Sequence, residues 1–228
     1  MRAFASALAL SLLACARAPE LAADPALQAI ADEVSAERLM QTLQAQVDAH
    51  LGDTPMDCSG WDVSYPPDCH HTRTLAGLAM ERELTAAGLT VTRHESARAG
   101  FLTSNLVAEL PGVSAPHEVI LVAAHYDAFY GGADDNGSGV AAVVELARVL
   151  SRHRFARTIR FVGFDLEELG LVGSTRYVND QLAVTGAAPI AALIFDCIGF
   201  ASDARGSQGS LPGFPTPEQG KFIAVMSN

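Results

Sequence analysis

Apolar residues recur along this chain with two periods, one typical of strands and the other typical of helices. Short apolar or alternating runs predict strands at residues 89–95, 104–110, 118–124, 158–164, 190–195 and 221–227. Spacings of three and four predict helices at residues 35–51, 73–87, 140–150 and 173–183. Because strands and helices alternate from residue 89 onward, we predict an α/β fold with a largely parallel sheet.

The ends of the predicted helices carry recognisable signals. Ser35 is a candidate N-cap for the first helix, and Gly88 is a candidate C-terminal stop for the second. The expected apolar face of the first helix consists of Leu39, Leu43, Val47 and Leu51. That of the second consists of Leu75, Leu78, Ala79 and Leu84. Residues 19–34 show no such period and are expected to form a linker.

Composition and charge narrow the class of protein. The chain has 228 residues, 49% of them hydrophobic, which is enough for one domain with a sizeable core. The formal net charge of −11 argues against a nucleic-acid partner, because such a partner requires a basic face. The acidic residues are spread along the sequence, which is typical of a solubilising surface. The oligomeric state is left open.

The first 18 residues have the pattern of an export signal. Arg2 precedes an apolar run of small residues that is too short to span a bilayer. The sequence LLAC at residues 12–15 resembles a bacterial lipobox, which predicts lipidation of Cys15; the alternative is ordinary cleavage after residue 18. We therefore expect a periplasmic or secreted protein, or an outer-membrane lipoprotein that contacts the membrane only through its lipid.

The other three cysteines divide into a pair and a single residue. Cys58 and Cys69 bracket a loop-like segment, and an exported protein could join them in a disulfide; two free thiols are the alternative. Cys197 follows an apolar strand and is expected to be a small buried residue.

Side chains able to bind a metal follow the predicted strands. They are His125, Asp127, Asp135, Glu167, Glu168 and Asp196. Because the carboxyl ends of parallel strands lie along one edge of a sheet, these groups from three strands are expected to meet there. Few Lys or Arg residues lie nearby in the sequence, so the clustered carboxylates would repel one another unless a divalent cation lay between them. Histidine and carboxylates without a thiolate favour zinc or a similar metal.

In two pairs of these residues, the two members are expected to have different roles. The neighbours Glu167 and Glu168 can act as general base and metal ligand. His125 and Asp127 are separated by one residue of an extended segment, so their side chains share a face. Asp127 is therefore expected to be a carboxylate that orients the imidazole of His125.

Three separated blocks resemble those of the exported dizinc aminopeptidase family, which includes bacterial leucyl aminopeptidases, carboxypeptidase Q and glutamate carboxypeptidase. The blocks are HYD…GGADDNGSG, FVGFDLEELGLVGS and FDCIG. The resemblance implies a zinc exopeptidase domain at residues 35–228, folded as a three-layer sandwich around a mostly parallel, mixed central sheet. It also implies an aminopeptidase that hydrolyses N-terminal residues of peptides with a zinc-activated water.

The same resemblance implies a role for each motif residue. The ligands it implies are His125 and Asp196 on one zinc ion, Glu168 on a second, and Asp135 bridging both. Glu167 is the implied base, which takes a proton from the attacking water. A cis peptide bond is implied after the bridging residue, between residues 135 and 136.

One part of the family pattern is missing. The family has a fifth ligand, a histidine well downstream of the Asp196 position, whereas this sequence has no histidine after His153. His50, His70 and His71 precede the strands and are expected to be solvated or structural. We therefore expect a C-terminal truncation, with the chain as given binding one metal weakly and turning over little substrate.

Two alternatives remain open. A carboxypeptidase, a dipeptidase or a glutaminyl-cyclase-like enzyme of the same fold would use similar ligands. A catalytically dead binding domain is the other alternative; the missing histidine favours it, and the four other ligands oppose it. The preferred residue of a peptide substrate is not indicated.

Overall fold

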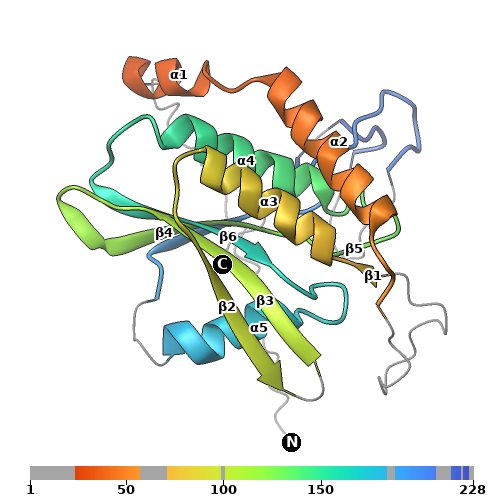
Figure 1. Cartoon of the computed structure of the whole chain (residues 1–228). Coiled ribbons are helices and arrows are strands. Elements are labelled where there is room, and N and C mark those ends of the chain that lie inside the picture. Colours follow the sequence, from red (N-terminus) through yellow and green to blue (C-terminus); the bar gives the residue numbers. More distant parts are fainter. Residues whose placement is uncertain are drawn as a thin grey trace, which may run out of the picture.

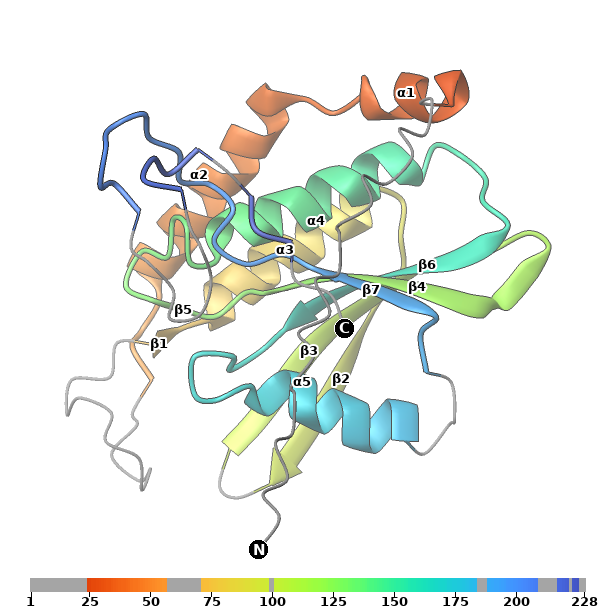
Figure 2. The same cartoon turned by 180° about the vertical axis from the view of Figure 1, so that it is seen from behind.

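A mixed sheet lies between helices in the computed structural model, which describes residues 24–56, 71–98, 101–183, 188–208, 217–221 and 223–225. The strands of the sheet are β2 (Val91–Arg98), β3 (Phe101–Leu110), β4 (Ala115–His125), β6 (Arg157–Phe164) and β7 (Ala191–Ile194). Helices α3 (Thr74–Ala86) and α4 (Gly137–Leu150) cover one face, and α2 (Ala36–Gly52) packs on these two helices (Figure 1). Helix α5 (Val172–Tyr177) and its π-helical continuation η1 (Val178–Leu182) lie on the opposite face (Figure 2).

The strand order is β2-β3-β6-β4-β7. Strand β4 is parallel to both neighbours, whereas β3 is antiparallel to β2 and to β6. The α/β sandwich with a mixed sheet is confirmed, but its parallel part is limited to β6, β4 and β7. No helix separates β2 from β3, and consecutive strands without a crossover pair antiparallel. A separate ribbon pairs β1 (His71–Thr72) with β5 (Ala128–Phe129).

The main core lies between the sheet and the helices α3 and α4. The apolar period predicted for α4 is confirmed, because its residues Val140, Val143, Val144 and Ala147 are buried against the sheet. They meet the fully buried residues Met80, Leu84, Leu106 and Phe161. Gly88 ends α3 with a φ of +86°, a conformation that favours glycine, as the sequence predicts.

The predicted apolar faces of α2 and α3 are partly wrong. In α2 the buried residues are Thr42, Gln46 and His50, because this helix packs on other helices and places polar groups at the contact. In α3, Leu75 and Leu78 are exposed. The small residues of α3 face inward instead; a Cβ on Gly77 would lie 2.9 Å from the ring of Tyr126.

A buried carboxylate joins α2 to α4. Ser35 caps α2 as predicted, with its hydroxyl accepting from the amide of Arg38 at 3.3 Å. Glu145 of α4 is 1% exposed and accepts from the Ser35 amide at 2.8 Å and from Arg38 Nε at 3.0 Å. Arg148 Nη1 lies 3.5 Å from the same carboxylate. The arrangement fixes the first turn of α2 against the middle of α4.

Two further expectations differ from the structure. The segment predicted as a linker contains helix α1 (Pro25–Ala31), which is capped by Asp24 and has no buried residue. The strand predicted at residues 221–227 is absent from the described residues 221 and 223–225. Ile223 and Val225 are exposed there and pair with no strand in the part of the chain that is described. None of the described helices is both long and apolar enough to cross a bilayer.

Candidate metal centre

A histidine and two carboxylates from three elements converge at the carboxyl ends of the parallel strands. His125 is the last residue of β4, Asp196 follows β7, and Asp135 lies in the turn before α4. One potential ligand atom from each lies within 4.8 Å of the others. Nε2 of His125 is 3.2 Å from Asp135 Oδ1 and 3.7 Å from Asp196 Oδ1. The predicted convergence of these three residues is therefore present.

His125 is held so that Nε2 faces the carboxylates. Its Nδ1 lies 3.0 Å from the backbone carbonyl of Asp127, which fixes the ring orientation. Nε2 is buried and makes no hydrogen bond to any described group. Burial lowers the pKa of His125, but the carboxylates of Asp127, Asp135 and Asp196 outweigh burial and raise it to about 12. The site thus strongly favours a positive charge beside these carboxylates.

The side chain of Asp127 has a second task that the sequence does not predict. Its Oδ1 accepts from the amide of Glu167 at 3.0 Å, and its Oδ2 accepts from the amide of Glu168 at 3.2 Å. Oδ1 lies 3.5 Å from His125 Nδ1, so the closer partner of the imidazole is the Asp127 carbonyl rather than its carboxylate. Asp127 therefore orients His125 chiefly through its backbone, and its fully buried carboxylate fixes the turn that carries both glutamates.

Glu167 and Glu168 lie at the border of the cluster. Glu167 Oε2 is 3.9 Å from His125 Nε2, and its side chain is 30% exposed. Burial raises the pKa of Glu167, with the charge of His125 opposing the shift. Burial, reinforced by Asp135 and then Asp127, raises the pKa of Glu168 to about 7. Glu168 lies outside the group of three convergent ligands, although its carboxyl group interacts electrostatically with Asp135.

Asp134, the acid next to Asp135, stabilises the loop that carries Asp196. Asp134 Oδ1 accepts from the amide of Gly199 at 2.7 Å and from the hydroxyl of Ser138 at 3.1 Å. The Ser138 hydroxyl in turn accepts from the amide of Ile198 at 3.0 Å. These bonds join the start of α4 to the loop that carries Asp196. Asp134 lies before the first residue of α4, so no helical spacing in the sequence could have identified its pairing with Ser138.

Asn136 makes a second connection between the same two segments. Its side chain caps α4 by accepting from the amide of Gly139 at 3.1 Å, and it donates to the carbonyl of Phe195 at 2.9 Å. The peptide bond between Asp135 and Asn136 is cis, as predicted. A Cβ on Gly139 would lie 2.3 Å from Asn136 Oδ1, so only glycine allows this approach.

Several residues singled out from the sequence lie elsewhere or outside the described part of the chain. Cys197 is exposed, with a φ of +49°, so the prediction of a buried cysteine is wrong; the residue lies past the end of β7, where the chain leaves the sheet. His50 and His71 are buried rather than solvated. Cys15, Cys58, Cys69 and His70 fall outside the described residues. The predicted disulfide and the lipidation therefore stay predictions.

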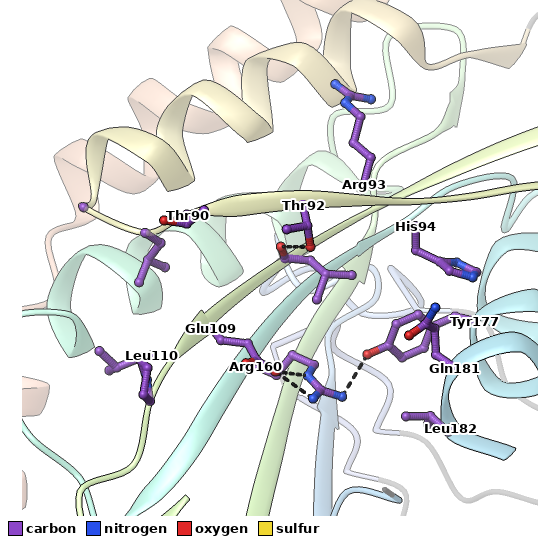
Figure 3. A pocket seen from close by; sticks show the side chains of 14 residues that line it. Thr90, Thr92, Arg93, His94, Glu109, Leu110, Arg160, Tyr177, Gln181 and Leu182 are labelled. Atoms are coloured by element: carbon purple, nitrogen blue, oxygen red, sulfur yellow. Dashed lines mark hydrogen bonds and ion pairs between the residues drawn. The ribbon is translucent and has the colours of Figure 1, made fainter. Parts of the chain in front are cut away.

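A cavity of about 770 Å³ lies away from the candidate metal ligands, between the sheet and η1 (Figure 3). Arg160 extends into it and donates to Glu109 Oε1 at 2.7 Å and to the hydroxyl of Tyr177 at 3.1 Å. The ring of His94 packs against Tyr177 with centroids 5.6 Å apart. Because Arg160 and Glu109 neutralise each other, their charges are already compensated within the cavity, and we assign it no function.

The sequence and the fold both have known counterparts. Residues 105–214 match the model of peptidase family M28. Leupeptin-inactivating enzyme 1 of Streptomyces exfoliatus is 41% identical over 121 residues, which cover 51% of this chain and 27% of that protein. The chain thus spans about a quarter of the length of this relative.

Three solved structures show the same fold. The LapA aminopeptidase of Legionella pneumophila superimposes with a TM-score of 0.60 at 24% identity, covering 81% of this chain and 49% of that one. A Zn-dependent exopeptidase of Parabacteroides distasonis superimposes with a TM-score of 0.55 at 19% identity, covering 75% of this chain and 64% of that one. A glutaminyl cyclase of Bacteroides thetaiotaomicron superimposes with a TM-score of 0.53 at 19% identity, with the same two coverages of 75% and 64%. Residues 105–214, which include all six predicted site residues, are therefore similar to peptidase family M28.

Proposed function

We propose that the protein is a zinc-dependent exopeptidase, an aminopeptidase that releases N-terminal residues from peptides. The observation that carries the proposal is the buried Nε2 of His125, which has no hydrogen-bond partner among the described groups and faces carboxylates from two other elements. The family match and the aminopeptidase among the solved structures of this fold support it.

The donor set fits zinc. One imidazole nitrogen and carboxylate oxygens are ligands that zinc accepts, and the site's preference for positive charge suits a divalent cation. We propose that His125, Asp135 and Asp196 hold one ion. A second ion would share Asp135 and use Glu168. When bound, zinc would polarise the peptide carbonyl and favour attack by water at neutral pH.

Glu167 is the proposed general base. Its raised pKa suits a group that accepts a proton from water and then donates it to the leaving amine. The amides of Glu167 and Glu168 both donate to the buried Asp127, so the two glutamate side chains start from a fixed turn. This fixed backbone lets one glutamate face the water while its neighbour faces a metal.

The substrate, partner and location also remain proposals. The acidic residues around His125 favour a substrate with a positively charged amino terminus. We propose that the protein acts outside the cytoplasm, because its first 18 residues have the pattern of an export signal. A lipid on Cys15 would be its membrane contact.

A pair of adjacent substitutions tests the function. The zinc-loaded full-length protein is expected to hydrolyse aminoacyl anilides with a free amine, and N-acetylation of the substrate should abolish the reaction. Glu167→Gln should lower kcat by about 10²-fold or more while zinc still binds. The matched variant Glu168→Gln should lose the second zinc ion and keep the ion held by His125, Asp135 and Asp196. Absence of hydrolysis by the zinc-loaded wild type, or retained activity after chelation, would contradict the proposal. Cyclisation of an N-terminal glutamine without hydrolysis would favour the cyclase alternative.

A further inference from the structure

His71 is buried next to the metal centre, and no described group makes a hydrogen bond to its imidazole. Its side chain is 0% exposed, and neither Nδ1 nor Nε2 has a hydrogen-bond partner in the described part of the chain. The ring of Phe129 covers it, with centroids 4.1 Å apart. A buried N–H without a hydrogen-bond partner destabilises the folded state, so the placement of this imidazole requires a reason.

The polar group that faces His71 is the carboxylate of Asp127. Nδ1 of His71 lies 3.8 Å from Asp127 Oδ2, which is about 1 Å longer than an ordinary hydrogen bond. The ribbon of β1 and β5 creates this approach, because it pairs His71 with Phe129, two residues past Asp127. Burial lowers the pKa of His71 despite the nearby Asp127, so the imidazole is neutral and carries one proton.

The carboxylate of Asp127 is the group on which both glutamates depend. Its two oxygens accept the amides of Glu167 and Glu168, and Oδ1 also faces His125. A rotation of this carboxylate would release at least one glutamate amide. The side of Oδ2 that faces the β1–β5 ribbon is bounded by His71. A donor there would stabilise both the charge and the orientation of Asp127.

We propose that His71 is a positioning residue, which directs an Nδ1–H at Asp127 Oδ2 and thereby holds the turn of Glu167 and Glu168 in place for metal binding. The inference rests on the proposed function for its catalytic consequence. Its effect on metal binding does not require turnover. His71 touches neither substrate nor metal, and acts only through Asp127.

Three substitutions of His71 separate this role from simple packing. His71→Asn keeps a donor near the place of Nδ1, His71→Gln moves the donor towards the place of Nε2, and His71→Phe removes it. We expect the zinc Kd to rise about 10-fold or more in the Phe and Gln variants. In the Asn variant it should stay within about 3-fold of the wild-type value. Thr72→Val is the matched control. Thr72 lies next to His71 in β1 but does not face Asp127, and the substitution removes its hydrogen bonds to His50 and Tyr130.

The measurements are zinc affinity by chelator competition, thermal unfolding, and ¹⁵N NMR of the His71 ring in the wild-type protein. Thr72→Val should lower the unfolding temperature and leave the zinc Kd within about 3-fold of wild type. NMR should show a neutral ring protonated on Nδ1. Protonation on Nε2 would overturn the inference. A loss of zinc affinity that is proportional to the decrease in unfolding temperature in all four variants would also overturn it. Wild-type protein without peptidase activity would contradict the proposed function, and the affinity and NMR comparisons would still test His71.

Discussion

Asp134 and Asp135 are neighbours of the same chemical type, and the structure assigns them different tasks. Asp135 faces His125 Nε2 at 3.2 Å, whereas Asp134 accepts from Gly199 at 2.7 Å and holds the loop that carries Asp196. The same change to asparagine at each position should therefore have different consequences. Asp135→Asn should act on zinc affinity, and Asp134→Asn should act on folding stability.

The magnitudes follow from the kind of interaction that each substitution removes. Zinc bound to a protein site releases about 10–16 kcal/mol, which is about 2.5–4 kcal/mol for each of about four ligands. Loss of the Asp135 carboxylate should therefore raise the zinc Kd roughly 60- to 700-fold. In Asp134→Asn the neutral amide oxygen can still accept from Gly199, so only the charge-assisted part of the hydrogen bond disappears. That change should cost about 1 kcal/mol of unfolding free energy.

Chelator competition measures the first quantity, and urea unfolding of the metal-free protein measures the second. Asp134→Asn is expected to change the zinc Kd by less than about 10-fold, because Asp134 reaches the metal ligands only through the loop. Equal losses of zinc affinity in the two variants would refute the assignment of Asp135 as the ligand. A decrease in zinc affinity of less than about 10-fold in Asp135→Asn would also refute this assignment.

Three further predictions concern stability and the geometry of the site. Glu145→Gln should lower the free energy of unfolding by about 1–3 kcal/mol in urea at pH 7, because it weakens the charge-assisted hydrogen bonds that the buried Glu145 accepts from the partly exposed Arg38. The exposed control Glu118→Gln should change it by less than about 1 kcal/mol. Burial raises the pKa of Asp165 to about 6, so the folded state holds this proton more tightly than the unfolded state and stability falls as pH rises from about 4 to about 6. In Asp165→Asn the free energy of unfolding should fall by up to about 3 kcal/mol less over this pH range than in the wild type. Plots of unfolding free energy against pH that are parallel for the two proteins would contradict the assignment. Gly139→Ala should lower stability by about 1–2 kcal/mol by displacing the cap residue Asn136, and an unchanged unfolding temperature would contradict the close approach seen here.

The sequence predicts the convergence of the candidate ligands well because their positions follow from local patterns. Apolar runs mark β4, β6 and β7, and a polar residue directly after such a run lies at the carboxyl edge of the sheet. His125 and Asp196 are found in this way. Asp135 required the resemblance to a family, because the choice between two adjacent acids depends on a turn whose shape the sequence pattern does not give.

The features that the pattern did not reveal depend on contacts between distant segments. The β1–β5 ribbon is only two residue pairs long, which is too short to show a strand period in the sequence. The proximity of His71 to Asp127 therefore could not be predicted. Hydrophobic spacing does not indicate the polar face of α2, because Thr42 and Gln46 hydrogen-bond to other helices. The antiparallel hairpin of β2 and β3 could have been inferred from the missing crossover between them.

Zinc-edge anomalous diffraction from crystals of the zinc-loaded protein tests the central claim most directly. We predict a peak within about 2.0–2.2 Å of His125 Nε2 and of carboxylate oxygens of Asp135 and Asp196. A zinc peak at any other set of ligands, with these three side chains left uncoordinated, would contradict the account.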